Sequence, residues 1–422
     1  MTGRPTNWAG NIVYRADRVH RPRTVGELQD LVSSSQQVRA LGSGHSFNRI
    51  ADTAGALVSV AGLPPVMDID ADRATVTVGG GIRYGELAQH LHAEGWALPN
   101  LASLPHISVA GACATGTHGS GNANGNLSTA VAAIEMVTAD GELTILRRDA
   151  DGGRFRAAVV GLGAFGIVTA LTLDIIPDFD VAQFVYDDLP GEQLKTHFEE
   201  IFSSAYSVSV FTRWTGSRHS MVWLKRRLGD HNAPAPEQWM GAKLADQPRH
   251  PIPGEPTAYA TQQLGVPGPW HERLPHFRLD FTPSSGEEIQ SEYLLPRPVA
   301  AEALDAVAGL GERMAPILLI SEIRTVAADE LWMSMSYQRD TVALHFTWIK
   351  DTAAVTPVAA ALEERLLPLG ARPHWGKFFT VPAPAVNALY EHSSGFRAQL
   401  GQVDPAGKFR NDFINEYFPA AG

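Results

Sequence analysis

The sequence predicts an α+β fold that is divided into more than one domain, and three observations support this prediction. The chain has 422 residues, which at about 150 residues per domain corresponds to two or three domains. Residues 1–180 alternate short strands, helices and glycine-rich turns without a regular βαβ repeat. Beyond residue 177 aromatic residues become more frequent and the strand patterns lengthen, which indicates that a second domain begins there.

Hydrophobic spacing and turn residues assign the elements of the N-terminal part. Helices are expected where apolar residues recur at helical spacing, and strands where apolar residues run together or alternate. A hairpin is expected around Asp140 and Gly141, because this dipeptide favours a tight turn between two strands. The expected helices are residues 23–33 and 84–94, and the expected strands are residues 38–41, 57–60, 75–78, 134–137 and 143–146.

Residues 161–166 match the Gly-x-Gly-x-x-Gly fingerprint of dinucleotide-binding proteins, but the following residues argue against a nicotinamide site. Such a fingerprint has to open a helix. Residues 167–176 are instead rich in β-branched side chains, alternate in polarity and end at Pro177, which is typical of a strand. We therefore interpret the glycines as points of close backbone approach, and a nicotinamide-dependent dehydrogenase remains the more distant alternative.

Longer strands and one long irregular segment characterise the second part of the chain. Strands are expected at residues 207–214 and 221–225. Residues 229–269 contain many prolines and no regular pattern, which fits either a lid over a functional site or an excursion on the surface. From residue 372 the sequence becomes rich in turns again.

Composition excludes several classes of function. The formal net charge is −11 and the isoelectric point is near 5.7, and residues 225–227 are the main basic run, so no nucleic-acid partner is expected. Cys113 is the single cysteine and permits no internal disulfide. The first residues form no apolar leader, and no apolar run approaches the roughly 18 residues that cross a bilayer. We expect a cytoplasmic protein without a membrane partner.

The glycine turn after the strand at residues 38–41 is the first candidate site. Gly42 and Gly44 allow close backbone approach, so that amides and the hydroxyls of Ser43 and Ser46 can converge on a pyrophosphate. His45 would then lie beside the bound dinucleotide. The alternative is an ordinary tight turn whose histidine faces water.

Three further segments carry polar groups that catalysis would need. Alternation in residues 317–325 places Glu322 and Arg324 on one face of a strand, and alternation in residues 341–349 places His345 and Thr347 together. Residues 374–379 are expected to form an aromatic strand that contains Lys377, and a buried lysine needs a partner or a task. The alternatives are a structural ion pair, a core histidine and a lysine that extends to solvent.

A series of short motifs, taken in order and spacing over nearly the whole chain, carries a resemblance to one enzyme family. The motifs are NWAGN at residues 7–11, GSGHSFN at 42–48, ASLPHISVAG at 102–111, ATGTHGSG at 114–121, QSEYLLP at 290–296, SEIRTVAAD at 321–329, HFTW at 345–348, HWGK at 374–377 and DPAGKF at 404–409. The chain resembles the vanillyl-alcohol-oxidase-type flavoproteins, and within them the alditol oxidases and the related aldonolactone oxidases.

The resemblance implies a particular organisation of the chain. Residues 1–177 would form an FAD-binding domain of two α/β parts, and residues 372–422 would return to that domain. Residues 178–371 would form an α+β cap, or substrate, domain built on an antiparallel sheet that closes over the flavin.

The resemblance also implies FAD as the cofactor, bonded through its 8α-methyl group to His45. His118 is the less favoured attachment point, and Cys113 is expected to be a packed hydrophobic residue. Neither histidine has a sequence partner at metal-ligand spacing, so no metal site is expected. The implied FAD-binding residues besides His45 are Leu41, Gly42, Ser43, Gly44, Ser46, Phe47, Ser103, Ser108, Gly111, Thr115, Gly116, Thr117, His118 and Val168.

The implied reaction is oxidation of a terminal primary alcohol of a polyol to an aldose, with dioxygen reduced to hydrogen peroxide, by a monomeric enzyme. Arg324 and Lys377 would stabilise the developing alkoxide, and His345 is a candidate proton acceptor. Glu322 would hold Arg324 in place and accept hydrogen bonds from substrate hydroxyls. Ser103 and Thr347 would bind further hydroxyls along the substrate. An aldonolactone oxidase or dehydrogenase is the nearer alternative, and a flavin-binding module without catalysis is a third.

Overall fold

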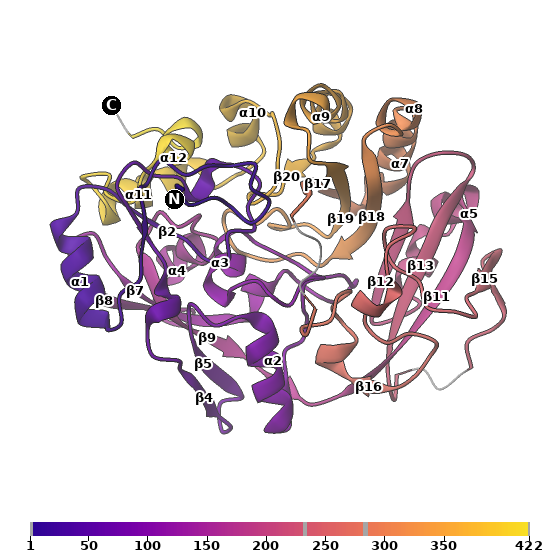
Figure 1. Cartoon of the computed structure of the whole chain (residues 1–422), viewed down its shortest axis with the longest axis horizontal. Helices are drawn as coiled ribbons and strands as arrows, with labels where there is room; N and C mark the ends of the chain where they lie inside the picture. The colour runs from indigo at the N-terminus through magenta and orange to yellow at the C-terminus, as the bar shows by residue number, and fades with distance from the viewer. Residues whose placement is uncertain (1–2, 231–233, 282–285, 421–422) are drawn as a thin grey trace.

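The computed structural model describes residues 3–230, 234–281 and 286–420, and it confirms the α+β fold. Two unlike halves lie side by side in Figure 1, one formed by the indigo-to-magenta N-terminal elements and the other by a large sheet of later strands. The yellow C-terminal helices return to the N-terminal half, where their apolar side chains join its core.

Two sheets organise the N-terminal half. A small parallel sheet has the order β1-β3-β2, and a five-stranded antiparallel sheet has the order β4-β5-β9-β7-β8. The predicted hairpin is present, because β7 pairs with β8 across the turn at Gly141. The strands are β1 Val19–His20, β2 Val38–Ala40, β3 Ala56–Val58, β4 Met67–Asp70, β5 Thr75–Gly79, β7 Val131–Val137, β8 Leu143–Arg147 and β9 Ile167–Asp174, with β6 Trp96–Ala97 and β10 Ile176–Pro177 forming a separate pair.

The two predicted helices of this half are present as α1 and α2, and two further helices, α3 and α4, were not predicted. Helix α1 starts after Thr24, whose hydroxyl accepts a hydrogen bond from the Glu27 amide, and it buries Leu28 and Val32. The helices are α1 Val25–Ser34, α2 Tyr84–Ala93, α3 Val109–Ala114 and α4 Gly152–Val159. Short 3₁₀ turns occur along the chain at Arg49–Ala51, Val60–Gly62, Leu127–Ala130, Thr257–Tyr259, Trp270–Glu272, Arg297–Val299 and Leu367–Leu369.

The glycines at residues 161–166 open strand β9 rather than a helix, which confirms the interpretation of this motif. Their turn presents backbone carbonyls to Arg39, a fully buried side chain of β2. The Arg39 guanidinium donates to the carbonyls of Leu162 at 2.8 Å and Gly163 at 2.9 Å, and also to those of Ile50 and Phe409. One side chain therefore joins segments that are hundreds of residues apart in the sequence.

The second half is built on a ten-stranded antiparallel sheet with the order β14-β15-β11-β13-β12-β18-β19-β17-β20, and β16 also pairs with β11. The predicted strands at residues 207–214, 221–225, 317–325 and 341–349 all belong to it. The bounds are β11 Asp180–Pro190, β12 Ser207–Thr212, β13 Arg218–Arg227, β14 Gln238–Trp239, β15 Ala242–Leu244, β16 Gly268–Pro269, β17 Glu288–Pro296, β18 Leu318–Val326, β19 Thr341–Ile349 and β20 Arg372–Pro373.

The two faces of this sheet differ in chemistry. One face is apolar, with Val210, Ile323 and Leu344 packed in one core against the helices. The opposite face carries buried charged residues, among them Glu322 and Arg324. The helices that pack with the apolar face are α5 Gly191–Thr196, α6 Phe198–Phe202, α7 Ala300–Ala308, α8 Gly311–Met314 and α9 Thr352–Leu366.

Two segments differ from the sequence-based expectation. Residues 229–269 are more regular than expected, because β15 and β16 both pair with β11; residues 231–233 lie outside the described part of the chain. The expected strand at residues 374–379 is wrong, since β20 ends at Pro373 and a turn follows, with the Lys377 amide bonded to the His374 carbonyl. The turn forms because Trp375 is anchored in the core and its neighbours bond to other loops.

The C-terminal helices complete the N-terminal half. They are α10 Ala383–Ala388, α11 Ser393–Val403 and α12 Asp412–Tyr417. Phe396, Phe413 and Ile414 lie in the same core as side chains of β5, β7 and β9. The domain boundaries at residues 177 and 371 stay a prediction. None of the helices in the described residues combines the length and the apolar character needed to cross a bilayer.

Replacing Arg39 by lysine should destabilise the protein, because an ammonium cannot reach the four carbonyls that the planar guanidinium bonds. Each buried carbonyl left unpaired costs stability, so we expect the free energy of unfolding to fall by about 3 kcal/mol. Denaturant unfolding of Arg39→Lys measures this, with the exposed Arg18→Lys as the matched control. Equal midpoints for the two variants would contradict the structural role of Arg39.

Candidate active site

Three neighbouring strands bring polar side chains into one row on the charged face of the large sheet. Glu292 of β17 lies opposite His345 of β19, and His345 lies opposite Glu322 of β18. Residues that are directly opposite in an antiparallel sheet point to the same face. In the adjacent row Gln290 lies opposite Thr347. The sequence-predicted pairs from β18 and β19 therefore meet in space, joined by two residues of β17 that sequence reasoning did not select.

Arg324 lies among these carboxylates and is buried. Its Nη2 donates to Glu292 Oε1 at 2.5 Å, whereas its Nε lies 3.6 Å from Glu322 Oε2. Its Nη1 donates to Ser103 Oγ at 3.3 Å. The sequence-based expectation gave Glu322 the task of holding Arg324, but the structure gives the shorter contact to Glu292. Glu322 Oε2 is correspondingly less engaged by Arg324.

Both carboxylates stay ionised despite their burial. Burial by itself raises the pKa of Glu292, but the charge of Arg324 and the neighbouring His118 outweigh it and hold that pKa well below the ordinary value. Burial also opposes ionisation of Glu322, and Arg324 together with His276 lowers the pKa of Glu322. Two buried anions thus share one buried guanidinium, an arrangement that is stable only as a complete set.

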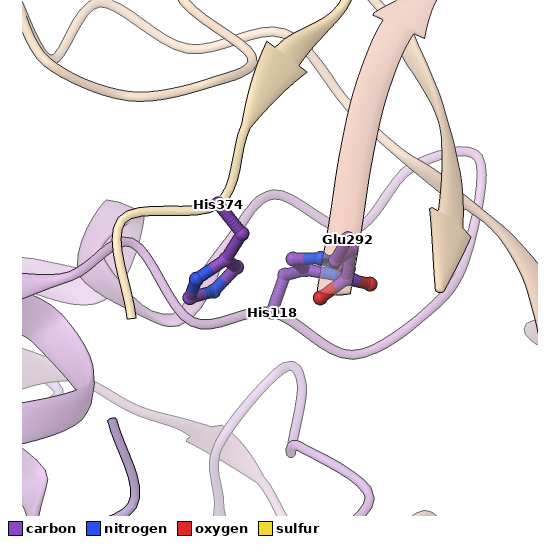
Figure 2. Close-up of side chains that lie close together, drawn as sticks. All are labelled: His118, Glu292 and His374. Carbon is purple, nitrogen blue, oxygen red and sulfur yellow. Dashed lines mark ion pairs between the residues drawn. The ribbon is translucent and has the colours of Figure 1, made fainter. Parts of the chain in front are cut away.

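Glu292 also belongs to a buried cluster with His118 and His374, in which one polar atom of each residue lies within 4.8 Å of the others. Figure 2 shows His118 beside Glu292, with His374 approaching from the segment after β20. His118 Nε2 is 3.2 Å from Glu292 Oε1. Sequence spacing showed no such partner for His118, because the fold brings these residues together from distant parts of the chain.

The hydrogen bonds of His374 do not suit a metal ion. His374 Nδ1 accepts a hydrogen bond from the Gly376 amide at 3.0 Å, so the neutral ring carries its hydrogen on Nε2 and has no free lone pair there. His118 Nδ1 lies 2.9 Å from the Gly119 carbonyl, which can only accept. The cluster packs two histidine rings against Glu292, the carboxylate that pairs with Arg324.

Lys377 reaches the same row from the turn that follows β20. Its Nζ donates to Gln290 Oε1 and lies 5.3 Å from the centre of the Phe47 ring. Burial lowers the pKa of Lys377, and the charge of Arg324 adds to that effect. His345 Nε2 lies 3.2 Å from the same Gln290 oxygen, and burial lowers the pKa of His345 to about 3. His345 is therefore a neutral imidazole at physiological pH.

His45 lies at the end of the loop after β2, next to the Lys377 turn. Its ring stacks on Trp8 with 4.7 Å between ring centroids and 21° between planes. Burial and then the charge of Lys377 lower the pKa of His45 to about 4, which favours the neutral imidazole. Its Nδ1 is buried and has no hydrogen-bond partner among the described residues. A neutral, held imidazole with an unpaired nitrogen suits attachment to another group.

The loop at residues 41–48 is tied to the Lys377 turn through the backbone. The Phe47 amide donates to the Gly376 carbonyl at 2.8 Å. The Asn48 side-chain amide donates to the carbonyls of Trp375 and Lys377, each at 2.8 Å. His45 and Lys377 therefore hold a fixed relation, although more than 300 residues separate them in the chain.

The glycines of the expected FAD cradle leave no room for a side chain. A Cβ on Gly42 would lie 2.4 Å from Ser108 Oγ, and a Cβ on Gly111 would lie 2.7 Å from the same oxygen. Ser108 Oγ is buried and has no hydrogen-bond partner in the described part of the chain. Two loops thus approach closely around an unpaired hydroxyl, which fits a phosphate-bearing cofactor.

The remaining expected cofactor residues lie on the same loops or on adjacent strands. Leu41 continues the pairing of β2, its amide donating to the Val58 carbonyl, and Ser43 Oγ accepts from the Ser108 amide. The carbonyl of Val168 in β9 lies where a Cβ on Gly80 would clash with it, and Val168 lines a small cavity together with Cys113. Gly44, Ser46 and Phe47 lie in the His45 loop, and Thr115, Gly116 and Thr117 follow α3 just before His118. Cys113 itself is buried, with its sulfur 3.4 Å from the Tyr84 hydroxyl.

Comparison with known proteins places this geometry in a family. Residues 16–147 match a family model described as an FAD binding domain, and residues 286–417 match one described as D-arabinono-1,4-lactone oxidase. The chain is similar to a cholesterol oxidase crystal structure from B. sterolicum, with a TM-score of 0.79, 15% identity, and coverage of 98% of this chain and 96% of that chain. At that identity the likeness shows the fold alone.

Two curated relatives span the whole chain. The L-gulono-1,4-lactone dehydrogenase of Mycobacterium tuberculosis is 29% identical over 97% of both chains. The alditol oxidase of a Streptomyces species is 53% identical over 99% of both chains. The match at 53% identity over nearly full length, together with the FAD-binding domain, shows that this chain belongs to the alditol oxidase family of FAD-dependent oxidoreductases.

Proposed function

We propose that this protein oxidises the terminal primary alcohol of a linear alditol, such as xylitol or sorbitol, to the aldose, while dioxygen is reduced to hydrogen peroxide. The sequence of the Streptomyces relative supports this substrate class. The observation that carries the proposal is the position of two cations, Arg324 and Lys377, at one row of buried hydrogen-bonding side chains. A neutral polyol chain needs such groups along its length and a cation at the reacting oxygen.

Bound FAD would supply the acceptor for the hydride that leaves C1. The chain's residues prepare the substrate for that step. Arg324 and Lys377 stabilise the negative charge that develops on the C1 oxygen as its proton leaves. This stabilisation makes a strong base unnecessary, which suits His345, a weakly basic neutral imidazole that can accept the proton.

The other polar groups would fix the remainder of the polyol. Glu322 Oε2, Ser103 Oγ and the Thr347 hydroxyl offer acceptors and donors for hydroxyl groups beyond C1. Glu292, which the sequence did not single out, orients Arg324 without having to bind substrate. FAD would be attached covalently through His45, whose ring is held by Trp8.

The substrate class is tested by a panel of alditols and sugar lactones with purified holoenzyme. We expect kcat/KM for xylitol or sorbitol to exceed that for gulono- and galactonolactone by roughly 100-fold, because a site that pairs with each hydroxyl rejects a ring that cannot reach them. Oxygen consumption and peroxide formation are measured together. Faster turnover of the lactones, or turnover only with an artificial dye, would contradict the proposal.

Covalent attachment is tested by denaturing electrophoresis viewed under ultraviolet light. The wild-type band should fluoresce and the His45→Ala band should not, because the substitution removes the nitrogen that bonds to the cofactor. His106→Ala is the matched control, since His106 is a half-buried histidine close to His45 and its band should keep its fluorescence. A fluorescent His45→Ala band would refute this linkage.

The cationic pair is tested by Arg324→Ala and Lys377→Met. Each should lower kcat by roughly 1,000-fold, because a positive charge aimed at a developing oxyanion acts mainly in the transition state. Lys350→Met is the control, since Lys350 is an exposed lysine beside the acidic Glu287 rather than the polar row. Loss of binding with kcat preserved would show that the two cations only bind substrate.

A further inference from the structure

A buried lysine and a buried histidine are linked to Glu322 through hydrogen bonds. Lys225 belongs to β13 and is 1% exposed, and His276 comes from the segment after β16 and is 5% exposed. His276 Nε2 lies 2.7 Å from Glu322 Oε1, and His276 Nδ1 lies 3.0 Å from Lys225 Nζ. Lys225, His276 and Glu322 therefore form a hydrogen-bonded chain that ends at the Glu322 carboxylate.

The hydrogen bonds of Lys225 fix the arrangement of protons in this line. Its Nζ donates to the carbonyls of Leu274 and Pro275, which can only accept, and its third contact is His276 Nδ1. A charged ammonium has three hydrogens and satisfies all three partners. If the proton moves to His276, the amine keeps two hydrogens for the carbonyls and accepts from the ring. In both states Nε2 carries a hydrogen that points to Glu322.

We propose that Lys225 and His276 are positioning residues that hold Glu322 as an oriented anion and thereby set how tightly the substrate hydroxyls bind. This inference rests on the proposed function, in which Glu322 accepts hydrogen bonds from the polyol. It extends that function to two residues that lie behind the substrate-binding groups.

The charge balance of the site supports this role. Burial lowers the pKa of Lys225 to about 7, with Glu322 acting in the opposite direction, so a lysine here carries a cost that an apolar residue would avoid. The role of Lys225 and His276 in keeping Glu322 ionised and in a fixed orientation accounts for this free-energy cost. Oε1 is occupied by His276, whereas Oε2 lies 3.6 Å from Arg324 Nε and keeps capacity for a substrate hydroxyl.

The same segment also holds Ser103. The amides of His276 and Phe277 donate to the Ser103 carbonyl at 3.0 and 3.2 Å, and Ser103 Oγ in turn accepts from Arg324. The His276 ring is packed edge-on against Trp223 and Phe211, with centroids 5.1 and 5.5 Å away. One rigid segment therefore sets the spacing between Glu322 and Ser103, the two groups proposed to read hydroxyls along the polyol.

The test compares His276→Gln with His276→Leu in flavin-loaded enzyme. Glutamine can accept from Lys225 and donate to Glu322, whereas leucine fills similar space and does neither. We expect His276→Leu to raise KM for xylitol roughly 10- to 100-fold with kcat changed less than about threefold, because the lost interaction serves binding in both ground and transition states. His276→Gln should stay within about threefold of the wild type in both constants.

His219→Leu is the matched control. His219 is a buried histidine on β13, the strand that also carries Lys225. The His219 ring contacts Trp214 rather than a carboxylate. A purely structural effect of losing a buried histidine would change the melting temperature in both leucine variants and leave KM unchanged. An unchanged KM in His276→Leu, or a glutamine variant as impaired as the leucine variant, overturns the proposal.

Lys225→Met provides a second route if His276→Leu does not fold. It removes the donor to Nδ1, so the ring is no longer held in one protonation pattern, and KM should again rise about tenfold. A wild-type KM in Lys225→Met overturns the proposal. If the wild-type enzyme turns over lactones but no alditol, the proposed function fails, and the same KM ratios measured on the lactone still decide the positioning role.

Discussion

A positive charge inside the protein is the constraint on which this site depends. The Arg324 guanidinium is buried on the polar face of a sheet, and a buried ion is tolerated only when it is paired and its hydrogen bonds are satisfied. Glu292 and Glu322 supply the opposite charges from the strands on either side of β19. Each anion in turn has a histidine behind it, His118 for Glu292 and His276 for Glu322. The polar row is therefore a coupled set in which each member requires the next.

The large sheet makes this set possible because one of its faces is packed in an apolar core while the other carries the charged residues. Alternate residues of β17, β18 and β19 enter an apolar core under α7 and α9, and that core fixes the strand register. A shift of one residue would move every charged side chain into the core and every apolar one into the site. The large apolar face thus determines where the carboxylates and the guanidinium meet.

The sequence predicted much of the fold and roughly half of the site. Period-two alternation placed Glu322 with Arg324 and His345 with Thr347 correctly, because it depends only on neighbours along one strand. The same alternation in residues 290–292 could have selected Gln290 and Glu292. Lys225 and His276 could not be found, since their partners depend on strand order and on a loop path. The turn at residues 374–379 was mistaken for a strand because its aromatic residues serve the core individually.

The contacts of Arg39 have a consequence for how the protein is made. The loop that carries His45 lies between β2 and residues 49–52. The Arg39 side chain joins these residues to the C-terminal part of the chain, because it donates to the carbonyls of both Ile50 and Phe409. The Asn411 side-chain amide donates to three further carbonyls, those of Arg49, Ile50 and Asp52. The Val38 amide is likewise bonded to the Lys408 carbonyl. During synthesis on the ribosome this loop emerges early, yet its clamp arrives only after some 360 further residues have been translated. A nascent fragment that ends before Lys408 therefore lacks all of these contacts with the C-terminal part of the chain, and they can form only when translation is nearly finished.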